Sequence, residues 1–237
     1  VHGDGGDLVK LLGIDQPFYG LRAHGQDGRQ APSKVEDMAA DYIKEIQTIQ
    51  PKGPYYLGGY SFGGMVVFEV AQQLHKQGEE VALVALLDPT KPIHRKLASL
   101  DSAGSLPPLP NIILLRDEVR QHLRNLALLG LRERLAYLWE RVRWRIEGIK
   151  KELKMIACRF FLAVGRRVPF NLRMFYFFEI SYQAARTYTP QVYTGSMILF
   201  RTQTPSYDSR LDWPRLAAGG LEIHQIPGKH LEILKEP

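Results

Sequence analysis

A glycine-rich stretch, Gly58 to Gly64, stands between a strand-like segment and a helix-like segment. Its sequence, Gly-Gly-Tyr-Ser-Phe-Gly-Gly, contains the pattern Gly-x-Ser-x-Gly centred on Ser61. A chain that turns this sharply from strand to helix requires a sheet with helices packed against it, and the turn exposes the serine hydroxyl. We expect glycine at the flanking positions, Gly59 and Gly63, because only glycine lets strand and helix pass so closely.

Strand-like and helix-like segments alternate over the first ninety residues, and the alternation returns near the end of the chain. The predicted strands are 16–21, 55–58, 81–87, 196–200 and 221–226, and the predicted helices are 33–49 and 63–77. Such alternation is typical of an α/β protein with a mostly parallel sheet and helices on both faces. Ser33 and Glu36 have the spacing of a capping box at the start of the first helix.

The alternation stops after Asp88-Pro89, and about ninety residues follow without a convincing strand. Apolar residues recur there at three- and four-residue steps, which predicts a long amphipathic helix. We therefore expect an α/β core over residues 1–90 and 180–237, with residues 91–179 inserted as a helical lid. The lid should lie over Ser61 and turn apolar side chains inward, among them Leu135, Leu138, Trp139 and Val142.

The bulk properties exclude several classes of protein. The net charge is +6, and its excess of Lys and Arg within the insertion predicts a solvated helix face, since no nucleic-acid-binding motif accompanies it. A single cysteine, Cys158, rules out an internal disulfide or a cysteine zinc cluster and fits a reducing compartment, so we expect a cytoplasmic protein.

No signal peptide is evident, and the longest apolar stretch, residues 155–164, is interrupted by Arg159 and is too short to span a bilayer. The chain begins at Val1 without a methionine and ends at Pro237, soon after the last predicted strand. These ends are expected of an excised domain, or of a chain with unresolved ends.

A serine that acts as a nucleophile needs a histidine base and an acid that orients the base. In α/β-hydrolases the histidine comes last in chain order. His230 follows the last predicted strand in the loop Pro-Gly-Lys-His, whereas His224 lies within that strand and alternates to the opposite side. We therefore predict an α/β-hydrolase fold with Ser61 as nucleophile and His230 as base.

The acid has two candidate positions. Asp88 ends the strand that follows the serine turn and its helix, so its carboxylate should lie at the active edge of the sheet. Asp208 and Asp212 follow the strand at 196–200, where many α/β-hydrolases carry their acid. We prefer Asp88, because the later pair lies in a polar, turn-rich stretch where solvent-facing Asp is common.

Two backbone N–H groups should form the oxyanion hole. One belongs to Phe62, the residue after the predicted nucleophile. The other belongs to Asp4, within the early glycine-rich loop His2-Gly3-Asp4-Gly5-Gly6.

These motifs resemble those of the thioesterase domains that end non-ribosomal peptide and polyketide synthases, and of the related fatty-acid synthase thioesterases. The matches are the opening His-Gly loop, Gly-Gly-Tyr-Ser-Phe-Gly-Gly, Leu86-Leu87-Asp88-Pro89, Tyr193-Thr194-Gly195 and Ile226-Pro227-Gly228-Lys229-His230. They appear in the family's order and cover nearly the whole chain. The Leu-Leu-Asp-Pro match favours Asp88 as the acid. Residues 6–16 are fewer than the family's helix there requires, and the family's closing helix after His230 is absent.

The resemblance implies a thioesterase that releases an acyl, polyketide or peptidyl chain from the phosphopantetheine arm of a carrier protein, by hydrolysis or cyclisation through an acyl-Ser61 intermediate. The carrier protein would lie on the same or a neighbouring polypeptide. No intrinsic cofactor and no metal are expected. A free-standing serine carboxylesterase or lipase and a catalytically silent binding module on the same fold stay open as alternatives.

Overall fold

The computed structural model describes Lys10, Gly13, residues 15–90, 131–202 and 213–230, and Ile233; the side chains of residues 131–135, 137 and 138 are not described. The chain forms two compact units. The larger unit comprises Val1–Arg95 and Arg167–Pro237, and the smaller unit comprises Lys96–Arg166. The sequence-based boundaries at residues 90 and 180 stay a prediction.

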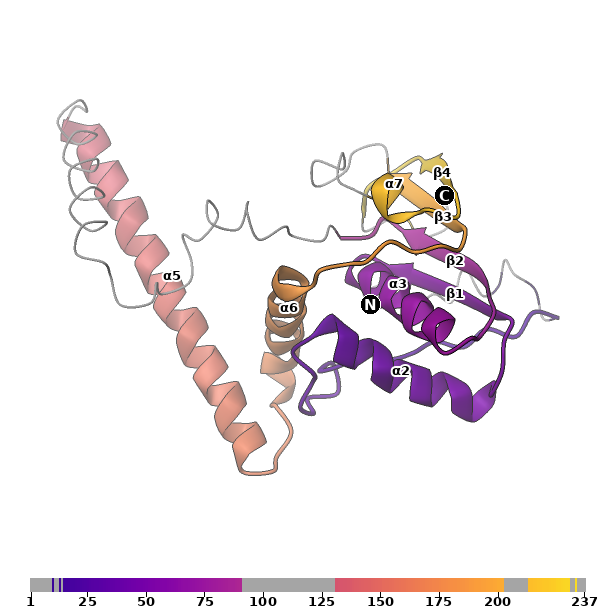
Figure 1. Ribbon diagram of the computed structural model, residues 1–237. Coiled ribbons are helices and arrows are strands. Elements are labelled where there is room, and N and C mark those ends of the chain that lie inside the picture. Colours follow the sequence, from indigo (N-terminus) through magenta and orange to yellow (C-terminus); the bar gives the residue numbers. More distant parts are fainter. Residues whose placement is uncertain are drawn as a thin grey trace. The chain divides into compact units, whose positions relative to one another are not determined.

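The larger unit is built on a parallel sheet of four strands (Figure 1). The strands are β1 (Tyr55–Tyr60), β2 (Val81–Leu87), β3 (Met197–Thr202) and β4 (Leu221–Ile226), and they lie side by side in that order. Every neighbouring pair is parallel. The carboxyl ends of all four strands therefore meet at one edge, as the sequence predicted for an α/β protein.

Four described helices belong to the same unit: α2 (Val35–Ile49), α3 (Phe62–Lys76), α6 (Phe170–Thr187) and the short α7 (Trp213–Leu216). Helix α3 packs on β1 and β2, and α2 packs on α3 (Figure 1). Apolar side chains from alternate strand positions and from both helices form the core. The largest fully buried ones include Tyr55, Met65, Phe68, Leu74, Leu86 and Met197.

A buried polar cluster ties α3 to the end of α6. The Tyr188 hydroxyl donates to Glu69 Oε2 over 2.8 Å, and Gln73 Nε2 donates to Glu69 Oε1 over 2.9 Å. Burial, and after it the Glu69 carboxylate, raise the pKa of Tyr188 well above its ordinary value, so the phenol keeps its proton. The carboxylate of Glu69 is thus satisfied away from water, as a buried charge requires.

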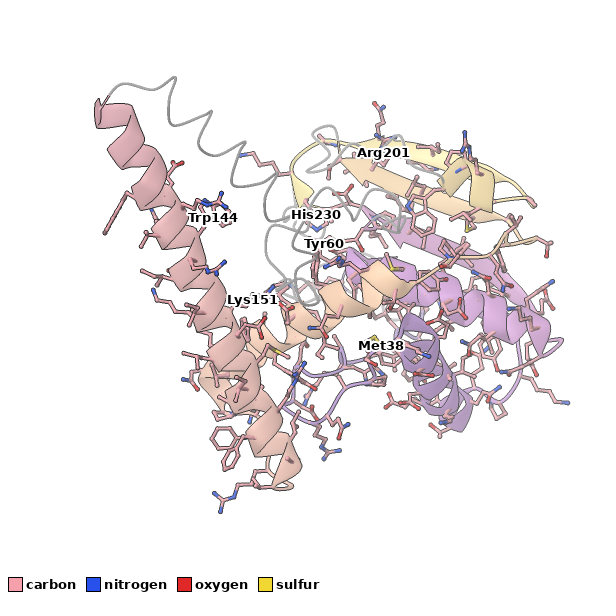
Figure 2. All side chains as sticks on the ribbon, turned by 60° about the vertical axis from the view of Figure 1, so that its left-hand side comes forward. Met38, Tyr60, Trp144, Lys151, Arg201 and His230 are labelled. Atoms are coloured by element: carbon pink, nitrogen blue, oxygen red, sulfur yellow. The ribbon has the colours of Figure 1, made fainter. Side chains whose placement is uncertain are left out.

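In the smaller unit, the described part is dominated by α5 (Leu131–Ala163), as the spacing of apolar residues predicted. Most of its large apolar side chains between Trp139 and Phe160 that the structure describes are exposed, and Figure 2 labels Trp144, which is 75% exposed, and Lys151 on this helix. None of the described helices is long and apolar enough to cross a membrane. The expectation that the inserted residues form a lid over Ser61 stays a prediction.

Two local predictions are wrong. Residues 16–21 form no strand, because no described strand pairs with them, and the side chains of Phe18 and Tyr19 are exposed. Helix α2 begins one residue later than the capping box requires. Its N-cap is Lys34, and no side chain caps the helix.

Replacing Tyr188 by Phe should lower the free energy of unfolding by about 1–3 kcal/mol, because a buried carboxylate oxygen of Glu69 loses its donor. Urea unfolding followed by fluorescence measures the effect. Tyr56→Phe is the matched control, since Tyr56 is 70% exposed and should change stability by about 0.5 kcal/mol or less. Equal stability of the two variants would contradict the proposed contribution of the Tyr188–Glu69 bond.

Candidate active site

Ser61 occupies the sharp turn between β1 and α3. Its backbone has φ 54° and ψ −124°, in the left-handed half of conformational space that residues other than glycine rarely adopt. Main-chain hydrogen bonds hold this conformation. Ser61 N–H donates to Leu87 O over 3.0 Å, and Thr90 N–H donates to Ser61 O over 3.0 Å. The end of β2 and the segment after it therefore fix the serine turn.

Two glycines allow β1 and α3 to approach this closely, but they are not the pair expected from the sequence. A Cβ on Gly59 would collide with the backbone of Gly63, and a Cβ on Gly64 would lie 3.2 Å from the carbonyl oxygen of Gly59 in β1 and 2.8 Å from Cβ of Pro89 after β2. A Cβ on Gly63 itself would meet no atom within 4 Å. The close approach thus requires glycine at 59 and 64, because the helix turns residue 63 away from the strand.

Asp88 follows the last residue of β2 and also has a positive φ, 41°. Its N–H donates to Phe200 O of β3 over 2.8 Å, which anchors the residue between two strands. The side chain is only 12% exposed. Its Oδ2 atom lies 2.6 Å from His230 Nδ1 and accepts a hydrogen bond of 3.1 Å from Thr202 Oγ1.

His230 lies in the loop after β4, and its other ring nitrogen, Nε2, is 3.0 Å from Ser61 Oγ. The imidazole therefore bridges the serine hydroxyl and the Asp88 carboxylate. A carboxylate can only accept, so Nδ1 carries the proton toward Asp88, and Nε2 is left to accept from the serine hydroxyl. His224, the rejected alternative, pairs instead with Glu222 at 2.7 Å.

The chemistry that this arrangement permits is nucleophilic attack by a hydroxyl whose proton passes to a neighbouring imidazole. Phe62 is the first residue of α3, where backbone N–H groups have no acceptor within the helix. Its N–H is thus suitable for binding a developing oxyanion. Asp4, Asp208 and Asp212 lie outside the described residues.

Two residues that the sequence did not indicate also belong to the site. Thr202, which is buried at the end of β3, donates to Asp88. Tyr60, which ends β1, donates its hydroxyl to the backbone carbonyl of His230 over 2.7 Å and stacks on the imidazole. Figure 2 labels Tyr60 and His230 next to each other. The only sequence signal for these residues is their position in the chain. Thr202 is at the carboxyl end of a strand that neighbours the site, and Tyr60 is at the carboxyl end of the strand that carries the serine.

Within the described part of the chain, no group of three or more His, Cys, Asp or Glu side chains is placed to hold a metal ion.

Residues 7–237 match the family model described as Thioesterase domain. The chain therefore belongs to the thioesterase domain family, and it is a hydrolase.

The curated relatives are multidomain synthetases. The chain is 29% identical to malpibaldin synthetase of Mortierella alpina over 238 residues. This alignment covers 96% of this chain and 4% of that protein. It is 55% identical to the dimodular nonribosomal peptide synthase of Bacillus subtilis (strain 168) over 82 residues. This alignment covers 34% of this chain and 3% of that protein. The chain thus spans only a small part of the length of these relatives.

Solved structures show the same fold. The NocB thioesterase domain in covalent complex with a fluorophosphonate nocardicin G analogue matches with a TM-score of 0.57 and 21% identity, over 99% of this chain and 84% of that chain. The four-domain nonribosomal peptide synthetase holo-AB3403 matches with a TM-score of 0.55 and 23% identity, over 91% of this chain and 16% of that chain. The parallel sheet and its helices form an α/β-hydrolase fold, as predicted.

The glycine geometry makes a prediction about stability. Gly64→Ala should lower the free energy of unfolding by about 1–3 kcal/mol, because the new methyl group overpacks against Pro89. Gly63→Ala, its matched control one residue away, should be neutral or more stable by up to about 1 kcal/mol, because alanine favours the helix. Urea unfolding midpoints measure both. Equal destabilisation of the two variants would refute the assignment of the close approach to Gly64.

Proposed function

We propose that this chain is a serine-dependent thioesterase that releases an acyl, polyketide or peptidyl chain from the phosphopantetheine arm of a carrier protein. One observation carries the proposal: the His230 imidazole lies 3.0 Å from Ser61 Oγ on one side and 2.6 Å from Asp88 Oδ2 on the other. The membership in the thioesterase family and the multidomain peptide synthetases among the relatives support the carrier-linked substrate.

In the proposed first step, Ser61 Oγ attacks the thioester carbonyl carbon while His230 Nε2 takes the hydroxyl proton. Asp88 holds the imidazole in the correct tautomer and stabilises its positive charge. The backbone N–H groups of Phe62 and Asp4 bind the oxyanion. When the carbon–sulfur bond breaks, His230 returns the proton to the departing thiolate, and the acyl group stays on Ser61.

In the second step, water or a nucleophile within the acyl chain attacks the acyl-serine ester. His230 removes the proton of that nucleophile and then protonates Ser61 as it leaves. Hydrolysis or cyclisation follows from which nucleophile attacks. The reaction needs no intrinsic cofactor, because the phosphopantetheine arm arrives with the substrate. The carrier protein lies on the same or a neighbouring polypeptide, and the single cysteine supports action in the cytoplasm.

Ser61→Ala should lower turnover of a carrier-bound thioester on the order of 10⁶-fold, because the nucleophile is lost. Mass spectrometry of the product released from a loaded carrier protein measures this. The fold should stay intact, and circular dichroism checks it.

Wild type should also take up one fluorophosphonate label on Ser61, and a protein that takes up none would be a silent binding module. Faster turnover of a p-nitrophenyl ester than of the loaded carrier would instead identify a carboxylesterase.

Asp88→Asn should lower turnover by about 10⁴-fold, because an amide facing Nδ1 favours the wrong imidazole tautomer. Asp208→Asn and Asp212→Asn are the matched controls and should change turnover far less. Steady-state kinetics with a soluble pantetheine thioester provides the comparison. The reverse order of effects would move the acid to the segment that follows β3.

A further inference from the structure

The order of the strands creates a positioning problem for the proposed base. Ser61 follows β1 and His230 follows β4, and β2 and β3 lie between these two strands. Neighbouring strands are about 4.8 Å apart, so the two strand ends are separated by about 14 Å. The short segment Pro227–Lys229 must carry His230 back across the ends of the sheet. A loop that reaches this far needs an anchor at its far end.

Asp88 anchors one atom of the imidazole, Nδ1, over 2.6 Å. A single hydrogen bond of this kind leaves the ring free to tilt about the bond and leaves the loop backbone unattached. Either movement would change the distance from Nε2 to Ser61 Oγ, which is the distance that proton transfer depends on. A second contact, on the face of the ring or on the backbone of His230, would remove this freedom.

Tyr60 makes both of these contacts. Its hydroxyl donates to the backbone carbonyl of His230 over 2.7 Å, and its ring stacks on the imidazole with centroids 4.9 Å apart and planes 26° apart. Burial, and after it the nearby Asp88 carboxylate, raise the pKa of the Tyr60 phenol, so the hydroxyl keeps its proton and stays a donor at neutral pH. Figure 2 shows the two labelled residues together.

We propose that Tyr60 is a positioning residue that holds His230 against Ser61, with its hydroxyl fixing the loop backbone and its ring fixing the plane of the imidazole. Tyr60 directly precedes Ser61 in the chain, so the nucleophile and the anchor of its base are carried by the same strand end. This inference rests on the proposed function, because it assigns Tyr60 to the action of His230 as base.

The test compares Tyr60→Phe, Tyr60→Leu and the control Tyr56→Phe. Tyr56 is on the same strand and is largely exposed. Tyr56→Phe therefore also removes a tyrosine hydroxyl from β1, but from a position outside the site. With a soluble pantetheine thioester, Tyr60→Phe should lower kcat about five- to tenfold with KM little changed, because one hydrogen bond is lost and the stacking stays. Tyr60→Leu should lower kcat on the order of a hundredfold, because the ring plane is also released. Tyr56→Phe should match wild type.

A second measurement does not depend on turnover. The proton that His230 Nδ1 shares with Asp88 should give a far-downfield proton NMR signal in wild type and in Tyr56→Phe. In Tyr60→Leu the signal should broaden or vanish, because the imidazole no longer holds one orientation. Tyr60→Phe should keep it.

If Tyr60 had a purely structural role, its variants would unfold more easily. Below their melting temperature they would keep the wild-type kcat and the downfield signal. This result would overturn the inference. Equal kcat values for Tyr60→Phe and Tyr60→Leu would refute the separate role of the ring. Ser61→Ala separates these failures from failure of the proposed function. If Ser61→Ala is inactive and the Tyr60 variants are fully active, only the inference on Tyr60 fails. If Ser61→Ala keeps its activity, the proposed function fails.

Discussion

The parallel pairing of β1 with β2 places the carboxyl ends of these two strands side by side, and the rest of the site depends on this arrangement. Tyr60 is opposite Leu87 in the register, so Ser61 and Asp88 are the first residues beyond two neighbouring strands. Both have a positive φ, and main-chain hydrogen bonds from Ser61 to β2 and from Asp88 to β3 hold them there. These hydrogen bonds to β2 and β3 offset the cost of the positive φ values at Ser61 and Asp88. The loop after β4 then places the His230 imidazole between the two side chains.

Periodicity and turn residues predicted the bounds of two strands correctly. The predicted strands at 81–87 and 221–226 match β2 and β4 to the residue. In β2 burial selects the apolar residues Val84 and Leu86, whereas most side chains of β4 are exposed, so burial does not explain the pattern of that strand. The predicted strand at 16–21 failed because a strand requires a partner, and pairing is not encoded in a local pattern. The capping box failed for a similar reason. Ser33 and Glu36 have the required spacing, but the backbone enters α2 one residue later.

For the site itself, chain order and strand ends led to Ser61, Asp88 and His230, and the structure brings these three side chains together, because the carboxyl ends of parallel strands share one edge. Their catalytic roles stay a prediction. The contributions of Thr202 and Tyr60 could not be predicted in this way. Each depends on the direction of a side chain across a strand end, which is set by tertiary packing. The same holds for Gly64, since only the path of α3 past Pro89 shows which glycine lacks room for a methyl group.

The sequence separation of the contacts has a consequence for how this protein matures. His230 is 142 residues from Asp88 and 169 residues from Ser61, so the loop after β4 must dock before the three groups meet. Contacts this distant in sequence are slow to form, because loop closure costs entropy before the contact stabilises anything. A folding chain can therefore contain β1, β2 and the serine turn and still lack the base. In the proposed mechanism, the onset of thioester cleavage during refolding would follow the docking of this last loop and would lag behind the formation of the sheet.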